Sequence, residues 1–495
     1  MLFTDPFFLF AFFPFTLAAF YLGRKYVGGS FAIWFLLFVS VGFYGYWSFK
    51  YLILLAAQIV ANFLFARALQ KDDRRWLLWV AILANLILLG YFKYRNFFLE
   101  NVSLLSGWQF TLTQIVVPLG ISFHTFQQIT FLLEVADGEH EEMPFPQYVL
   151  FVLFFPQLIA GPIVLHREMA SQLASIARNE LPYQGMFGPG FVIFCLGLFK
   201  KVCLADNLAP YVDICFEWPH HLQFLEAWSA VIGYALQLYF DFSGYSDMAV
   251  GLGLMLGMML PFNFNNPLSA TSIISYWNRW HITMTRFFTD HCYMPLAFAL
   301  HRTAAERELN QPWIFLLTVA TPTVITFLAA GLWHGAGWTF VIFGLINGVG
   351  LAANHAYRAA GLPRLPVLIC WILTALVVLV GHAYFRSGSL DQASAVLHSM
   401  FVPDRFLVLP LWADSVAKSL GIPVEFFDVF QAPNTTAYFI GQMVLLAVLA
   451  SLIPNIVATP MKIRHDYKTA FAVAFMLWLT AGWIGEQRTF LYFQF

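Results

Sequence analysis

Two histidines stand in otherwise apolar sequence: His281 in the segment YWNRWHITMT and His334 in the segment GLWHGAGWTF. Moving an ionisable group into hydrocarbon costs several kcal/mol, so such groups usually face a cavity or the interior of a helix bundle. Histidine is also the side chain best suited to take up and return a proton near neutral pH. The pair therefore suggests acid–base chemistry, while an inert, hydrogen-bonded histidine at a helix end remains the alternative.

The neighbours of His334 suit a binding site. Gly331, Gly335 and Gly337 leave room for a substrate or for a close approach of backbones. Trp333 can wall such a space and offer an indole N–H. We therefore take the two histidines as the centre of the molecule and the rest of the chain as the scaffold that positions them.

The composition places this scaffold in a membrane. The chain has 495 residues, of which 60% are hydrophobic and only 11% are charged, and its mean hydropathy is +0.70. Because soluble proteins carry about 25% charged residues, we expect an all-α polytopic membrane protein with room for roughly a dozen spans. The net charge of −1 gives no indication of a nucleic-acid partner. The five cysteines show no CxxC or zinc-ligand spacing, so no metal site is expected.

Apolar runs predict spans along most of the chain. The first run lacks a basic segment and a cleavage site, so we expect a retained span rather than a signal peptide. The predicted spans are 6–23, 31–49, 51–69, 76–92, 186–199, 313–330, 338–356, 366–385, 436–458 and 469–484. Basic clusters after the first and third spans place the N-terminus outside, whereas Lys93 and Arg95 argue for the opposite orientation. Residues 1–495 are predicted to form one membrane domain, with 386–434 as a polar excursion.

Polar residues interrupt several apolar runs. His124, Gln127 and Gln128 follow a Pro/Gly break and share one face of a predicted helix within 115–139. Such a face either looks into a substrate cavity or forms hydrogen bonds between helices. Prolines and a glycine in 147–164 predict a kinked or re-entrant element near the site.

Two carboxylates lie in the apolar run 224–260. Asp241 and Asp247 are six residues apart and would not share a face of an unbroken helix. Ser243 and Gly244 predict local unwinding between them. The carboxylates could orient a histidine, bind a cation or cap a helix.

The stretch 270–290 is predicted to be one amphipathic helix that lies at the interface or dips inward without spanning the bilayer. Trp277 and His281 would lie on one face of it, and Arg279 and Arg286 on another. Such arginines bind lipid phosphates or an anionic donor, or simply extend to water.

Ordered segments along nearly the whole chain resemble the membrane-bound O-acyltransferase family. The resemblance is to the bacterial branch that includes the alginate O-acetylation membrane protein and the D-alanyl transfer protein of teichoic acid synthesis. The segments are VPLGISFHTFQ, FFPQLIAGPIV, LFKKVCLAD, LQLYFDFSGYSDMAVGLGLMLG, YWNRWHITMTRFFTDHCYMPL, GLWHGAGWTFVIFGLINGV, AYFRS and the terminal FLYFQF. Alginate-type members usually read FYTFQ and FWRRWHISLS where this chain has FHTFQ and YWNRWHITMT, so the acceptor is not fixed by the match.

The resemblance implies that His334 is the catalytic histidine and that His281 lies near the same channel. It further implies a ring of about 11–13 tilted and re-entrant helices around a thin, funnel-shaped core. The implied location is the bacterial cytoplasmic (inner) membrane. By the same resemblance, the donor is acetyl-coenzyme A or another acyl thioester on the cytoplasmic side, with no permanently bound cofactor. The acceptor is a hydroxyl of a periplasmic or extracellular polysaccharide such as alginate or cellulose, reached through separate acetylation partner proteins.

Acyl transfer from a thioester to a hydroxyl requires a base for the hydroxyl proton and a donor for the developing oxyanion. His334 is the candidate base. His281 is the second candidate catalytic residue, and the candidate substrate-binding residues are Trp277, Asn278, Arg279, Asp241, Trp333 and Gln127. No GxSxG motif is present, so direct transfer is expected rather than transfer through an acyl-serine. Three alternatives are a D-alanyl transferase of the same fold, a lipid or protein acyltransferase, and a secondary transporter, although no internal repeat supports the last.

Overall fold

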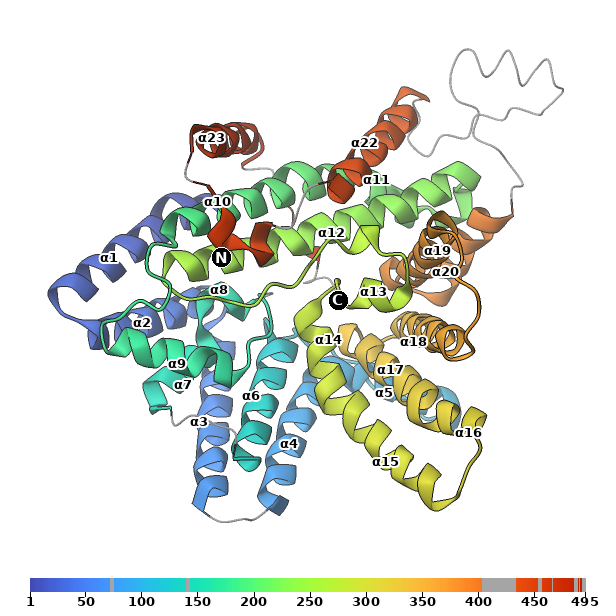
Figure 1. Cartoon of the computed structure of the whole chain (residues 1–495), viewed down its shortest axis with the longest axis horizontal. Coiled ribbons are helices and arrows are strands. Elements are labelled where there is room, and N and C mark those ends of the chain that lie inside the picture. Colours follow the sequence, from blue (N-terminus) through green and yellow to red (C-terminus); the bar gives the residue numbers. More distant parts are fainter. Residues whose placement is uncertain are drawn as a thin grey trace. The chain divides into compact units, whose positions relative to one another are not determined.

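A computed structural model describes residues 1–71, 75–138, 143–159, 161–402, 433–452, 456–464, 466–484, 488 and 490–491. Within these ranges the chain forms helices and loops and no β-strand (Figure 1). The predicted all-α class is therefore confirmed. Of the predicted excursion 386–434, residues 403–432 lie outside the described ranges.

The helices follow the predicted apolar runs closely. The first half contains α1 Phe13–Tyr26, α2 Gly29–Trp47, α3 Phe49–Lys71, α4 Arg75–Leu89, α5 Arg95–Ser106, α6 Ile121–Ala136, α7 Phe145–Leu153, α8 Phe155–Leu158, α9 His166–Ala177, α10 Phe187–Phe199, α11 Asp206–Glu217 and α12 Phe224–Met255. The second half contains α13 Ile273–Trp277, α14 Ile282–Phe288, α15 Met294–Glu306, α16 Gln311–Phe315, α17 Thr321–His334, α18 Trp338–Ala359, α19 Val367–Arg386, α20 Leu390–Phe401, α22 Pro433–Leu452 and α23 Tyr467–Ala481.

Seven helical segments among the described residues are long and apolar enough to cross a membrane. They are Gly29–Trp47, Phe49–Lys71, Arg75–Ser106, Phe187–Glu217, Gln311–His334, Trp338–Ala359 and Val367–Arg386. Each overlaps a span predicted from the sequence, so the multi-pass prediction is confirmed. Short π-helical turns such as Leu316–Ala320 join successive α-helices inside three of these segments.

Local sequence signals set where the helices begin. Pro156 lies in the first turn of α8, where a missing N–H costs no hydrogen bond. The side chains of Ser389 and Asp466 accept backbone N–H groups in the first turns of α20 and α23. Such caps satisfy donors that the helix itself leaves open.

The chain divides into two compact units. Unit 1 comprises 1–202, 242–262 and 456–494, and unit 2 comprises 203–241, 263–455 and residue 495. Helix α12 contributes residues to both units. Both histidines of interest, with α13, α14 and α17 to α19, belong to unit 2.

A buried amide network joins α3, α4 and α6, which lie side by side in unit 1 (Figure 1). The Gln58 Nε2 group donates to Asn85 Oδ1 at 2.7 Å, and Asn85 Nδ2 donates to Asn62 Oδ1 at 2.7 Å. Asn62 in turn donates to Gln128 Oε1 at 2.9 Å. Gln128 therefore forms hydrogen bonds between helices, which is one of the two interpretations that the sequence allowed for the polar face at 124–128.

The predicted break in 147–164 is confirmed between α7 and α8. The Phe151 carbonyl, left without a helical partner by the break, accepts hydrogen bonds from Gln127 Nε2 at 3.0 Å and Gln157 Nε2 at 2.5 Å. The Phe155 N–H donates to Ser40 Oγ at 3.2 Å. Side chains thus supply the hydrogen bonds that hydrocarbon cannot give to a broken helix.

The predicted unwinding at 243–244 is wrong, because α12 is continuous through these residues. Gly244 instead allows a close helix–helix approach: a methyl group on Gly197 of α10 would lie 2.5 Å from the Gly244 carbonyl oxygen. On the same pair of helices, Lys200 Nζ lies 2.6 Å from Asp247 Oδ2 in a largely buried ion pair. The carboxylate of Asp247 is therefore used within the scaffold of unit 1.

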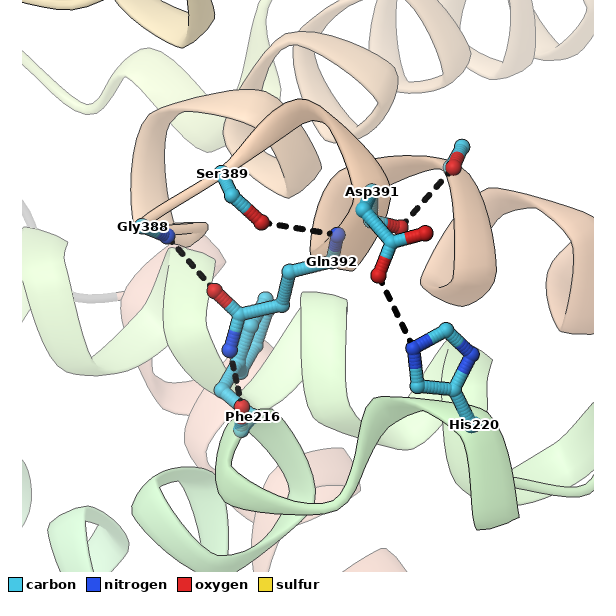
Figure 2. A network of polar contacts seen from close by, with 7 residues as sticks. Phe216, His220, Gly388, Ser389, Asp391 and Gln392 are labelled. Carbon is cyan, nitrogen blue, oxygen red and sulfur yellow. Dashed lines mark hydrogen bonds and ion pairs between the residues drawn. The ribbon is translucent and has the colours of Figure 1, made fainter.

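Polar contacts fasten the start of α20 to the end of α11 and the short 3₁₀ turn Pro219–His221 in unit 2 (Figure 2). Gln392 accepts the Gly388 N–H at 2.6 Å and donates to the Phe216 carbonyl. The Asp391 carboxylate lies 3.0 Å from His220 Nε2. These contacts hold the junction between α19 and α20 in place. They therefore also position the C-terminal end of α19, where the Phe385 ring packs near that of His334.

We predict that Gly197→Ala destabilises the protein by about 1–3 kcal/mol, because the added methyl group forces α10 and α12 apart. The matched control is Gly42→Ala on α2, where no heavy atom lies within 4 Å of the added carbon. Thermal unfolding of both variants in detergent checks this expectation. Equal midpoints for the two variants would contradict the packing role of Gly197.

Candidate active site

His334 is the last residue of α17, and its position follows from a tight crossing of α17 and α18. A methyl group on Gly331 would lie 2.3 Å from the Phe340 carbonyl oxygen, and one on Gly344 would lie 2.4 Å from the Phe327 carbonyl oxygen. Only glycines permit backbones this close. The glycines near His334 thus bring two helices together and fix where α17 ends.

Aromatic rings surround the buried His334 imidazole. Ring centroids of Trp333, Phe385 and Phe343 lie 4.9, 5.0 and 6.0 Å from that of His334. Phe343 and Phe385 also contact each other, at 4.8 Å. The sequence predicted the tryptophan wall but not the two phenylalanines, although Phe385 lies in the AYFRS segment. This environment excludes bulk water, which strengthens any hydrogen bond or charge formed at the imidazole.

The prediction of a single helix over 270–290 is wrong, because the chain breaks between α13 and α14 at His281. His281 has φ +44° and ψ +54°, a left-handed conformation that no helix interior contains. Asn263 holds the break: its carbonyl accepts the Ile282 N–H at 2.9 Å, and its Oδ1 accepts the Thr283 N–H at 3.2 Å and hydroxyl at 2.7 Å. Helix α13 has five residues, and α14 continues through the π turn Thr289–Tyr293 into α15. Neither segment is among the seven candidate spans found in the described residues.

The Trp333 indole links the two histidines. Its ring lies 6.0 Å from the His281 ring and 4.9 Å from the His334 ring. Phe288 of α14 also packs against it, at 6.3 Å. The structure therefore brings His281 and His334 to one aromatic residue, while their common role in the reaction stays a prediction.

Of the other predicted site residues, Trp277 joins this neighbourhood directly. Its ring lies 4.9 Å from Phe327 of α17 and 6.4 Å from Phe343 of α18. Its buried Nε1–H has no hydrogen-bond acceptor within the described parts of the chain. Asn278 is exposed, and Arg279 donates to Ser269 Oγ at 3.0 Å. Trp277 thus keeps a buried donor without an acceptor among the described residues, and it shares the neighbour Phe343 with His334.

Asp241 and Gln127 have other interactions in the structure. Asp241 is buried on the unit 2 part of α12, where its charge acts on the Tyr234 hydroxyl. Gln127 belongs to unit 1 and donates to the Phe151 carbonyl at the helix break. The Gln127 side chain therefore stabilises the helix break in the scaffold. A substrate contact for Asp241 or for Gln127 stays a prediction.

The two histidines differ in electrostatic setting. His281 lies outside the seven candidate spans, and burial lowers the pKa of its imidazole to about 3. It is therefore neutral near pH 7 and can donate one hydrogen bond and accept another. His334 lies at the C-terminal end of α17, where the helix dipole stabilises the positive charge that a base acquires with a proton. The arrangement suits His334 as a proton acceptor and His281 as a neutral partner.

Comparisons with known proteins identify the family of the chain. The model of the MBOAT, membrane-bound O-acyltransferase family matches residues 76–362, which include both histidines. A peptidoglycan O-acetyltransferase of Helicobacter pylori is 37% identical over 435 residues, 81% of this chain and 80% of that protein. A probable alginate O-acetylase of Azotobacter vinelandii is 34% identical, over 81% of this chain and 78% of that protein. A teichoic acid D-alanyltransferase of Bacillus subtilis is 28% identical, over 54% and 68%.

We predict that His281→Asn leaves stability near that of the unaltered protein, because asparagine adopts left-handed backbone readily. His281→Val, with a β-branched side chain, should cost about 1–3 kcal/mol in the same conformation. Thermal unfolding of the two variants measures the difference. If valine proves as stable as asparagine, the left-handed backbone at 281 is not a constraint on the fold.

Proposed function

We propose, from the premise that this chain belongs to the membrane-bound O-acyltransferase family, that it transfers an acetyl group to a polysaccharide hydroxyl with His334 as the general base. The chain is an integral, multi-pass membrane acyltransferase. The observation that carries the finer proposal is the buried His334 imidazole at the end of α17, enclosed by aromatic rings and joined to His281 through Trp333.

The proposed reaction is a direct acyl transfer. The His334 imidazole removes the proton of the acceptor hydroxyl as its oxygen attacks the thioester carbonyl carbon. The tetrahedral intermediate collapses, the carbon–sulfur bond breaks, and the leaving thiolate takes the proton from the imidazolium. The products are an O-acyl ester and a free thiol, so no further reactant is needed.

Two features of the site support this sequence of steps. The helix end favours the imidazolium that exists between the two proton transfers. The Trp277 indole N–H is the proposed donor to the oxyanion. Because general base catalysis supplies about 10²- to 10⁴-fold, holding both substrates in a dry site must supply the rest.

The proposed donor is acetyl-coenzyme A, or an acyl thioester on a carrier, on the cytoplasmic side of a bacterial inner membrane. The proposed acceptor is a cell-envelope polysaccharide on the far side, reached with separate acetylation partner proteins. Relatives named as O-acetylating enzymes match 81% of the chain at 34–37% identity, which favours acetyl over D-alanyl transfer. A transporter is disfavoured by the family membership.

We predict that His334→Ala lowers acyl transfer by at least about 100-fold without loss of folded protein, because the base is removed. His281→Asn should lower it less, since a neutral partner is lost while the backbone is retained. The measurement is the O-acetyl content of polysaccharide from a deletion strain that expresses each variant. His301→Ala on α15, an exposed histidine, is the matched control. Wild-type acetylation by a well-expressed His334→Ala protein would exclude His334 as the base.

We also predict that Gly335→Ala lowers transfer by about 10-fold or more, because its methyl group would lie 2.1 Å from the Phe340 ring. Phe340 packs on Phe385, which packs on His334, so the displacement reaches the base. Gly337→Ala is the control: its nearest contact would be 3.6 Å, and its extended backbone tolerates any residue. Equal activities in the two variants would contradict this chain of contacts.

A further inference from the structure

A third buried histidine, His382 on α19, lies beside the two that the proposed reaction uses. It stands one helical turn before Phe385, whose ring lies 5.0 Å from that of His334. The ring of His382 lies 6.0 Å from Trp280, the residue that precedes His281. His382 is therefore close to each histidine of the site through one intervening residue, Trp280 or Phe385, although no step of the proposed reaction involves it.

His382 faces a polar stripe on α12. Its ring contacts the Tyr234 ring edge-on at 6.0 Å, with an interplanar angle of 89°. Gln237 lies three residues after Tyr234 and so shares that face of α12. We refer to Tyr234, Gln237 and His382 as the hydroxyl cluster; all three belong to unit 2.

Each member of the hydroxyl cluster presents a polar atom that the surrounding protein does not satisfy. In the part of the chain that the structure describes, Tyr234 Oη, Gln237 Oε1 and His382 Nδ1 have no hydrogen-bond partner. The three residues are 0, 3 and 4% exposed. An unsatisfied buried polar atom costs about 1–3 kcal/mol, so three of them close together require an explanation beyond packing.

The charges around the cluster indicate what kind of group it accepts. Arg386 lies one turn after His382 and donates to Asp213 Oδ1 at 3.0 Å. The positive charge of Arg386 and the negative charge of Asp241 act on the Tyr234 hydroxyl in opposite directions. One cation thus stands among two carboxylates. This setting disfavours a phosphate or carboxylate, and it suits a neutral group that both donates and accepts hydrogen bonds.

We propose that the hydroxyl cluster binds hydroxyl groups of the acceptor sugar beside His334. This inference rests on the proposed function, since it assigns a place to the acceptor of that reaction. A sugar hydroxyl can donate its proton to Gln237 Oε1, and its oxygen can accept hydrogen bonds from the Tyr234 hydroxyl and from a protonated His382 Nδ1. One hydroxyl group can therefore provide a partner for all three atoms. The acceptor would then be held by residues distinct from those that move its proton.

The test uses the full-length protein in lipid nanodiscs with cellotetraose as the acceptor probe. Tyr234→Phe removes only the hydroxyl, and His382→Phe removes the ring nitrogens while it keeps a ring against Trp280. Each should weaken cellotetraose binding, measured by titration calorimetry, about 3- to 10-fold for a lost hydrogen bond. Hydrolysis of acetyl-coenzyme A without acceptor should stay within about twofold of the unaltered protein, because the thioester and His334 are unaffected.

The matched control is Tyr245→Phe, which removes a buried tyrosine hydroxyl from the unit 1 part of the same helix. Binding by Tyr234→Phe and His382→Phe equal to that of Tyr245→Phe would overturn the inference and leave buried water as the partner of the cluster. A parallel fall in thioester hydrolysis would also overturn it, since the cluster would then act on catalysis or folding. If the two variants weaken binding while even the unaltered protein transfers no acetyl group, the subsite stands and the proposed function fails.

Discussion

The constraint on which the structure depends is that hydrocarbon offers no hydrogen bonds, so every buried polar group needs a partner inside the protein. Most polar side chains in this apolar chain meet that demand by joining helices, as Gln128 and Gln127 do in unit 1. Other buried side chains keep polar atoms without a partner among the described residues, in unit 1 at His124 and in unit 2 at Trp277, Tyr234 and His382. The candidate substrate contacts are the members of this set whose rings pack near the histidine site in unit 2.

Close backbone contacts give the site its geometry. Gly331 and Gly344 let α17 and α18 cross tightly, which sets the end of α17 and places His334 among aromatic rings. Helix α13 ends at Trp277, and the left-handed residue His281 directly precedes α14, where Asn263 holds the turn through three hydrogen bonds. His281 and His334 thus both contact the Trp333 indole, from elements that are far apart in sequence.

The sequence predicted the helical class and the spans, because hydropathy can be read directly from residue types. The catalytic roles of His281 and His334 stay predictions. The sequence prediction failed where the same residue type can have either of two structural roles. Gly244 was predicted to unwind α12 but allows close packing, and the periodicity of 270–290 does not reveal the left-handed break at His281. His382 was overlooked, although an ionisable residue within the apolar run 366–385 was itself the signal.

The central claim is that His334 serves a hydroxyl and a thioester that arrive from opposite sides of the membrane. The most direct measurement uses sealed vesicles that hold labelled acetyl-coenzyme A on one side and polysaccharide acceptor, with any partner proteins it requires, on both. With the unaltered protein and with His301→Ala, label should appear on acceptor across the membrane, and with His334→Ala it should not. Label confined to acceptor on the donor's own side, or transfer undiminished in His334→Ala, would contradict the claim.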